Sequence, residues 1–242
     1  MKKLTTLAII LFISTGLHAQ WWGNDKVKGN GNVITETRDL GDYDGISSAG
    51  FMDVIIVAGE EGKITLEGES NLLEHIETKV SGNNLSIKVE KGYNLRPSSG
   101  KQIVITVPVK RISKLSLAGS GKVVTETTLE ADNFKLSVAG SGDLKASIEA
   151  DEIKASVAGS GNIRLSGNAN DMKLSIAGSG NLNAEQMKVM NISASIAGSG
   201  NAKVHCEGSL KARIAGSGNL KYTGNPSVED TKSVGSGKVI KV

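Results

Sequence analysis

The tripeptide Gly-Ser-Gly recurs through the second half of the chain at an almost constant interval. Six of its seven copies end a longer pattern, apolar–(Ser or Arg)–apolar–Ala–Gly-Ser-Gly, as in residues 174–180. A short, fixed period indicates a stack of equal structural units, each packed against its neighbours. The copies are separated by 18 to 21 residues and begin at Gly119, Gly140, Gly159, Gly178, Gly198, Gly216 and Gly235.

The pattern inside each unit predicts β-strands. Apolar Leu174 and Ile176 alternate with polar Ser175, which is the period-2 signal of a strand with one buried face. Glycine suits a sharp corner because it accepts positive φ without a Cβ clash. We therefore expect an all-β fold, a single-stranded, right-handed parallel β-helix (β-solenoid) with coils of about 18–21 residues.

An asparagine follows four of the corners, at Asn162, Asn181, Asn201 and Asn219. Stacked Asn side chains can hydrogen-bond to one another along the axis of a stack of strands. We expect these residues to form a structural ladder rather than ligand sites, and we interpret the corner serines in the same way.

The first half of the chain follows the same pattern less clearly. Residues 29–37 resemble residues 119–127, and in both copies the next aligned glycine comes 21 residues later, at Gly50 and Gly140. This similarity predicts that one continuous β-helix domain occupies residues 29–242.

Within that domain, residues 111–242 are expected to form the regular Gly-Ser-Gly coils, and residues 46–110 less regular elements. Alternating segments lie between the glycines of this earlier part, and alternation alone does not distinguish longer coils from β-hairpins. These segments are residues 51–57, 63–67, 85–90 and 101–107.

Residues 1–19 are typical of a secretory signal. Lys2 and Lys3 precede a short apolar stretch, and the segment closes with the small residue Ala19. Cleavage after Ala19 would leave a short segment, residues 20–28, before the β-helix. No later apolar run is long enough for a membrane helix, so we expect no integral membrane segment in the mature chain. Its expected location is the periplasm, the cell surface or the medium.

Several motifs resemble those of a known family. They are Phe-Met-Asp-Val at 51–54, Val-Ser-Gly-Asn-Asn-Leu at 80–85, Ile-Val-Ile-Thr-Val-Pro at 103–108 and Tyr-Thr-Gly-Asn-Pro at 222–226. Together with the Gly-Ser-Gly series, they make the chain similar to the GIN domain family, described as a putative auto-transporter adhesin head, over residues 30–242. The resemblance implies a right-handed parallel β-helix in an exported bacterial protein, with no established activity and no catalytic residues to transfer.

The sequence offers few residues for catalysis or metal binding. Cys206 is the single cysteine, which excludes a disulfide scaffold and multi-cysteine metal sites. His205 precedes it, but neighbours in a strand point to opposite faces, so the two should not act together. Phosphate-binding and calcium-binding glycine motifs do not occur in the repeats. We expect no catalytic residue, no metal and no cofactor.

Nucleic acid is not an expected partner. Only 3% of the residues are aromatic and the net charge is +3, whereas single-stranded nucleic acid is bound by basic grooves with stacking aromatic side chains.

A carbohydrate-active enzyme is the first alternative, because polysaccharide lyases and hydrolases also use right-handed β-helices. Sugar-bond hydrolysis needs a pair of carboxylates across a groove, and Asp151–Glu152 and Glu229–Asp230 are the adjacent acidic pairs at corner positions. Solvated charge is the simpler interpretation, since the regular steps leave no long loops to build a groove.

Two columns of basic residues are the candidate ligand site. Stacking would turn each column into a basic stripe that could hold an anionic polymer. Asp132, Asp151 and Asp171 precede three of the lysines, so mutually compensated surface charge is the competing interpretation. The first column is Lys114, Lys135, Lys154, Lys173 and Lys211, with Ser193 in its gap; the second is Lys145, Arg164, Lys203 and Lys221, with Asn183 in its gap.

The ends of a solenoid expose unpaired strand edges unless they are capped. No polar cap is evident in residues 235–242, and Trp21 and Trp22 could cover an end or contact a partner. We expect weak self-association or a partner at one end.

The sequence therefore favours an exported, non-enzymatic β-helix, an adhesin-like or surface-binding module for a polysaccharide or an envelope protein. A purely structural envelope component is the second alternative, after the carbohydrate-active enzyme.

Overall fold

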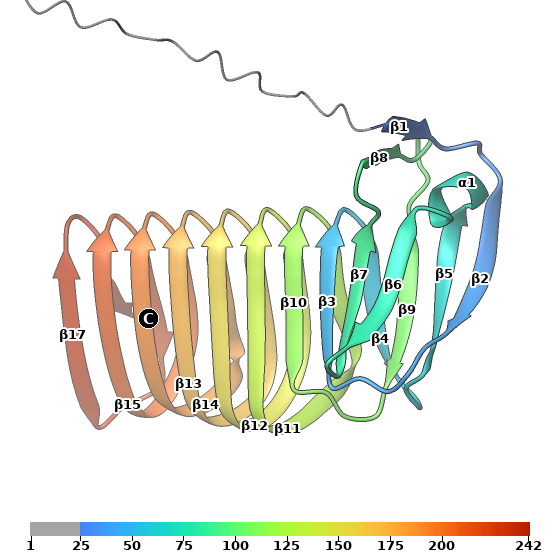
Figure 1. The fold of residues 1–242 in the computed structure, drawn as a ribbon. Coiled ribbons are helices and arrows are strands. Elements are labelled where there is room, and N and C mark those ends of the chain that lie inside the picture. Colours follow the sequence, from blue (N-terminus) through green and yellow to red (C-terminus); the bar gives the residue numbers. More distant parts are fainter. Residues whose placement is uncertain (1–24) are drawn as a thin grey trace, which may run out of the picture.

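The chain folds into an all-β solenoid of about seven turns (Figure 1). The computed structural model describes residues 25–242. The predicted fold class is confirmed, since successive coils pair in parallel along the solenoid. The predicted export signal and residues 20–24 lie outside the described residues.

The regular coils occupy the second half of the chain. Each long strand forms one whole coil, and only the two residues at the Gly-Ser-Gly corner separate it from the next. Equivalent residues stack directly, so Gly140 pairs with Gly159 and Gly159 with Gly178. The strands are β10 (Lys114–Gly119), β11 (Lys122–Gly140), β12 (Asp143–Gly159), β13 (Asn162–Gly178), β14 (Asn181–Gly198), β15 (Asn201–Gly216), β16 (Asn219–Thr223), β17 (Val228–Val234) and β18 (Val239–Lys241).

The core fills the inside of the coils, as the alternation predicts. Leu174 and Ile176 are buried, whereas Ser175 between them is exposed. The same alternation in every coil gives one continuous apolar core along the solenoid, and burial of this surface is the main favourable contribution to folding.

The corners are held by backbone hydrogen bonds between coils. The first glycine of each corner has a φ of 109° to 124°, a conformation that side chains rarely adopt. In the corners from Gly119 to Gly198, its carbonyl accepts two donors from the next coil: the N–H groups of Ser160 and Gly161 both lie 2.8 Å from the Gly140 oxygen. A Cβ on Gly161 would lie 2.5 Å from the Gly142 carbonyl oxygen and 2.6 Å from a methyl carbon of Val138. The stacking distance thus requires both glycines.

The predicted asparagine ladder is confirmed. The Asn181 amide donates to the Asn162 side chain (3.0 Å), Asn201 donates to Asn181 (3.2 Å), and Asn219 donates to Asn201 (3.1 Å). Asp143 begins the ladder by accepting from Asn162 at 2.8 Å.

Part of the region from residue 46 to 110 forms coils that stack on the regular ones. β3 (Gly45–Gly50) pairs in parallel with β10, and β4 (Asp53–Ala58) pairs in parallel with β11. Their other edges pair in parallel with β7 (Asn84–Val89) and β9 (Val104–Val109), respectively. The β3–β4 coil is therefore inserted between β7 and β9 on one side and β10 and β11 on the other, although it precedes all four in the chain.

Antiparallel strands complete this region, so both coils and hairpins occur in it. β6 (Ile76–Ser81) forms a hairpin with β7, while β5 (Lys63–Glu69) pairs antiparallel with both β9 and β2 (Val33–Asp39). Gly50 stacks on Gly119 as a coil corner, but residues 33–37 of β2 do not form a parallel coil strand as residues 122–127 do, although the two segments are similar in sequence. β2 is the last strand of its sheet, where an antiparallel partner completes the ladder of β5.

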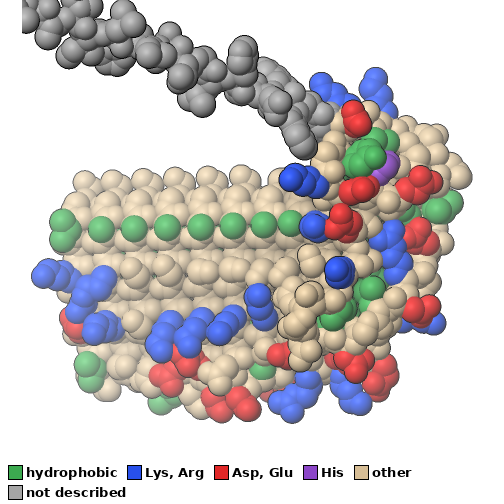
Figure 2. Space-filling model, in the orientation of Figure 1, with side chains coloured by type: hydrophobic (Ala, Val, Ile, Leu, Met, Phe, Trp, Pro, Cys, Tyr) green, Lys and Arg blue, Asp and Glu red, His purple; other side chains and the backbone are tan. Residues whose placement is uncertain are grey.

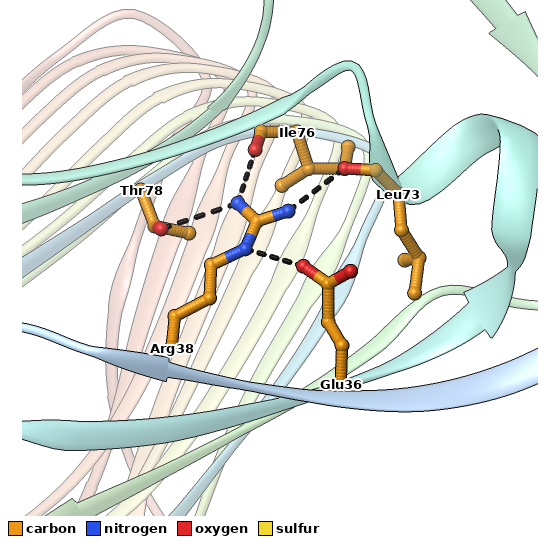
Figure 3. A network of polar contacts seen from close by, with 5 residues as sticks. All are labelled: Glu36, Arg38, Leu73, Ile76 and Thr78. Carbon is orange, nitrogen blue, oxygen red and sulfur yellow. Dashed lines mark hydrogen bonds and ion pairs between the residues drawn. The ribbon is translucent and has the colours of Figure 1, made fainter.

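The N-terminal end of the solenoid is covered. α1 (Ser70–Leu73) lies there with a two-stranded sheet of β1 (Asp25–Lys28) and β8 (Tyr93–Arg96). Figure 3 shows how Arg38 of β2 ties this end together.

The Arg38 guanidinium donates to the carbonyl oxygens of Leu73 (2.9 Å) and Ile76 and to the Thr78 hydroxyl (3.2 Å), and it pairs with Glu36. Arg38 thus binds the carbonyl of Leu73, the last residue of α1, which has no partner within so short a helix, and the carbonyl of Ile76, the first residue of β6.

We expect Gly161→Ala to lower the free energy of unfolding by about 1–3 kcal/mol, because the new methyl group overpacks against the Gly142 carbonyl. Ser160→Ala is the matched control: the side chain is exposed, so the change should stay within about 0.5 kcal/mol. Urea denaturation followed by circular dichroism measures both. Equal stability of the two variants would contradict the tight corner.

We expect Arg38→Ala to destabilise the protein by about 2 kcal/mol, because carbonyl groups lose a charged donor. Arg38→Lys should be intermediate, since an ammonium cannot reproduce the planar fan of donors. Lys63→Ala on the neighbouring strand is the control, because its pair with Asp39 is exposed and should contribute less than about 0.5 kcal/mol. The same denaturation measurement compares the three variants, and an Arg38→Ala effect no larger than that of Lys63→Ala would contradict the assignment.

Candidate binding faces

The solenoid has two main sheets, and the two basic columns lie on different ones. The second half of each regular coil joins the sheet of β10, β3, β7 and β6, whereas the first half joins the sheet of β4, β9, β5 and β2. The first column follows the former sheet and the second column the latter. The structure therefore builds two separate basic stripes and does not bring them into one site.

The first column is in direct register, as predicted from the sequence. Lys114 pairs with Lys135, Lys135 with Lys154, and Lys154 with Lys173. Ser193 then interrupts the column before Lys211. These lysines are all exposed, and neighbouring strands lie ~4.8 Å apart. Figure 2 shows the resulting line of basic side chains along the solenoid.

Serine and alanine columns run beside the first basic column on the same sheet. Ser116, Ser137 and Ser156 are Cα partners in adjacent coils, and so are Ala118, Ala139 and Ala158. The exposed alanines form a line of hydrophobic side chains above the basic line in Figure 2. Because these side chains are small, the lysines project beyond a flat surface.

A shallow hollow of about 390 Å³ lies between the lysine and serine columns. Its walls combine cationic ammonium groups, hydroxyl groups and apolar side-chain stems, a mixture suited to a polar chain with negative charges. The hollow is lined by Lys114, Ser116, Lys135, Leu136, Ser137, Lys154, Ala155, Ser156, Lys173, Leu174 and Ser175.

Glu152 neutralises part of this stripe. Its carboxylate lies 2.7 Å from the Lys173 ammonium nitrogen and 3.3 Å from that of Lys154. Hydrogen bonds from these two lysines hold the pKa of Glu152 below its usual value, and Glu152 in turn raises the pKa of Lys173. Within residues 25–242, Lys114 and Lys135 form no ion pair, so the positive charge is concentrated toward β10 and β11.

The second column is less continuous. Lys145 pairs with Arg164 and Lys203 with Lys221, but Asn183 separates the two pairs. Glu185 projects beside this gap, 3.5 Å from the Lys203 nitrogen. The second column therefore makes a shorter run of free positive charge than the first.

A larger hollow, of about 600 Å³, lies over the bend that joins the two sheets, and the sequence reasoning did not identify it. Glu-Ala-Asp occurs at 130–132 and again at 149–151 in the same register, which is the signal that could have found it. The alanines lie along the hollow and the carboxylates flank them. Within the described part of the chain, no group of His, Cys, Asp and Glu residues is arranged to hold a metal ion.

The adjacent acidic pairs considered for sugar hydrolysis are held in other interactions. Tyr222 donates its hydroxyl to Glu229 at 2.6 Å, and this hydrogen bond raises the pKa of Tyr222 to about 12. Arg213 contacts Asp230 at 2.6 Å and lowers its pKa. Glu152 is bound by two lysines and Asp151 accepts a hydrogen bond from Asn170 at 3.0 Å, so all four carboxylates contact neighbouring side chains.

His205 and Cys206 do not form a reactive pair, as predicted. Cys206 is fully buried, and burial raises the pKa of its thiol. His205 lies on the outer face, where its ring nitrogens contact Thr223 (2.8 Å) and Glu207 (3.0 Å). A nucleophile would need a thiolate beside a base, and this arrangement supplies neither.

In the described residues, no helix has the length and apolar character that crossing a membrane requires.

Comparison with protein families identifies the fold's relatives. The sequence profile described as "Putative auto-transporter adhesin, head GIN domain" matches residues 42–226. This chain belongs to the GIN domain family. No curated protein matches this GIN domain.

Solved structures of similar shape cover most of this GIN domain. A putative adhesin from Bacteroides fragilis has a TM-score of 0.80 at 23% identity, with 89% of this chain and all of that chain aligned. A putative lipid binding protein from Parabacteroides distasonis has a TM-score of 0.73 at 26% identity over 90% of this chain and all of that chain. A putative adhesin from the same species reaches 0.72 at 25% identity over the same shares.

Proposed function

We propose that this GIN domain is an exported, non-enzymatic surface module that binds an anionic polysaccharide along its first basic column. The observation that carries the proposal is the direct register of Lys114, Lys135, Lys154 and Lys173 beside a shallow polar hollow. A linear polymer with repeated carboxylate or sulfate groups could contact several of these lysines at once. Contacts along one polymer chain strengthen overall binding, because the first contact raises the effective concentration of the next charged group near its lysine.

The names of the relatives support an adhesin-like role. A putative adhesin of 25% identity and the family description both point to attachment. The proposal of binding without turnover is supported by the acidic pairs, whose carboxylates are held by Lys154, Lys173, Tyr222 and Arg213.

The test replaces Lys135, Lys154 and Lys173 together by Gln and measures the affinity of the purified protein for dextran sulfate and polygalacturonate at two salt concentrations. We expect at least a tenfold loss of affinity and a smaller salt dependence, because fewer counterions are displaced. The matched control replaces Lys145, Arg164 and Lys203 of the second column by Gln, with an expected change below about threefold. Similar losses in both variants would contradict a specific role for the first column.

The same samples distinguish the alternatives. Shortening of the polysaccharide chains would identify a carbohydrate-active enzyme. Retention on anionic phospholipid vesicles without retention on either polysaccharide would contradict the proposed ligand class, and absence of both would favour a structural role.

We expect Glu152→Gln to strengthen binding to dextran sulfate about three- to tenfold. The lowered pKa keeps Glu152 charged at neutral pH, so the polymer must compete with it for Lys154 and Lys173; the amide removes that competition. Glu185→Gln changes the net charge equally on the other sheet and should have little effect. Equal gains in the two variants would indicate a response to net charge alone.

A further inference from the structure

The C-terminal end of the solenoid is an open strand edge. β17 pairs with β15 on one side, and within residues 25–242 no strand covers its other side. All seven of its residues are exposed, including Val228 (59%) and Val234 (66%). The opposite end finishes in β2 and β6, but there Arg38 of β2 bonds to α1 and β6, so the two ends of the molecule differ.

The inward positions of β17 are polar. Glu229, Thr231 and Ser233 pair with Leu210, Ala212 and Ile214 of the core. β17 therefore presents no apolar inward side chain to solvent, and nonspecific hydrophobic association through this strand is disfavoured. What remains available for recognition is the unpaired backbone of the strand and the charges beside it.

The hydrogen bonds of β17 identify which backbone groups are free. Lys135, at the register position of Asp230, donates its backbone N–H to Ser113 of its preceding coil. The backbone groups of Asp230 therefore face β15, and its carbonyl also accepts from Arg213 of that coil at 2.9 Å. Alternate residues in a strand direct their N–H and C=O groups to opposite sides. The groups of Glu229, Thr231 and Ser233 therefore point to the open side.

The sequence of β17 is complementary to itself when it is reversed. It reads Val-Glu-Asp-Thr-Lys-Ser-Val from 228 to 234. In an antiparallel pair centred on Thr231, Asp230 lies opposite Lys232 of the second copy, Glu229 opposite Ser233, and Val228 opposite Val234. Both charge pairs are attractive and both exposed valines gain an apolar neighbour.

We propose that two copies of this chain associate tail to tail through antiparallel pairing of β17 with β17 about Thr231. The free groups of Glu229, Thr231 and Ser233 then form the hydrogen-bonded pairs. Asp230 and Lys232 occupy the non-hydrogen-bonded positions, where cross-strand side chains lie closest. The contact is isologous and closes on itself, because the covered N-terminal ends point away from each other. The contact uses β17 at the end of the solenoid, whereas the proposed polymer site is the run from Lys114 to Lys173, so neither proposal depends on the other.

The first experiment uses two charge variants, Asp230→Lys and Lys232→Asp, in analytical ultracentrifugation. In a homodimer, each places like charges opposite one another twice, and we expect dimerisation to weaken about tenfold or more relative to the unchanged chain. A mixture of the two variants restores opposite charges at both positions, so it should form heterodimers at least as readily as the unchanged chain does. A mixture no more dimeric than its components, or an unchanged chain that stays monomeric at millimolar concentration, overturns the proposal.

The second experiment tests the centre of symmetry by oxidative cross-linking. Thr231→Cys places two thiols opposite each other with Cα atoms ~5.5 Å apart, within the range that a disulfide spans, and should give a covalent dimer. Val228→Cys is equally exposed but lies about 20 Å from its own copy across the pair, and it should cross-link at least tenfold more slowly. Native Cys206 is buried and does not compete. Equal cross-linking rates overturn the register, whatever the stability of the charge variants.

Discussion

The carbonyl group of the first glycine in each corner fixes the geometry of the whole solenoid. From Gly119 to Gly198 it accepts two N–H donors from the next coil, as Gly140 does from Ser160 and Gly161, and the hydrogen-bond length sets the distance between coils. At that distance a Cβ on the second glycine has no space. Every other repeated feature, from the buried Leu and Ile positions to the asparagine ladder, follows from the register that these corners impose.

Much of the regular half could be predicted, because residues within a single coil determine its strands, its corner and its stacking. The alternation around Ser175 and the glycines of one corner are sufficient to give the strand faces, the turn and the stacking of Lys135 on Lys154. The N-terminal half could not be predicted in the same way, because β3 pairs with β10 across some sixty intervening residues, far outside the interval of 18 to 21 residues that links the regular coils. Likewise, Glu152 sits beside two lysines of different coils, a contact that becomes visible only once the register is known.

Charge on this molecule is organised by position within the coil rather than by composition. The net charge of the chain is small, yet stacking gathers basic residues into one column on each sheet and carboxylates along the adjoining bend. Such lines of like charge raise the local potential without changing the total. Glu152 partly neutralises the first basic column at β12 and β13. In the last coil, Asp230 occupies the position of the lysines and pairs with Lys211.

The insertion of the β3–β4 coil between strands that follow it in the chain has a consequence for how this architecture can change in length. The N-terminal end is a closed unit whose strands come from distant parts of the sequence, and removing any of them would leave its neighbours unpaired. Beyond β11, in contrast, each coil pairs its strands only with the coil before and the coil after. Duplication or loss of a single period there lengthens or shortens the solenoid, and with it the basic stripe, by one increment while the closed end stays intact. Over evolution, the solenoid can therefore gain or lose whole coils in the part beyond β11 but not at the closed N-terminal end.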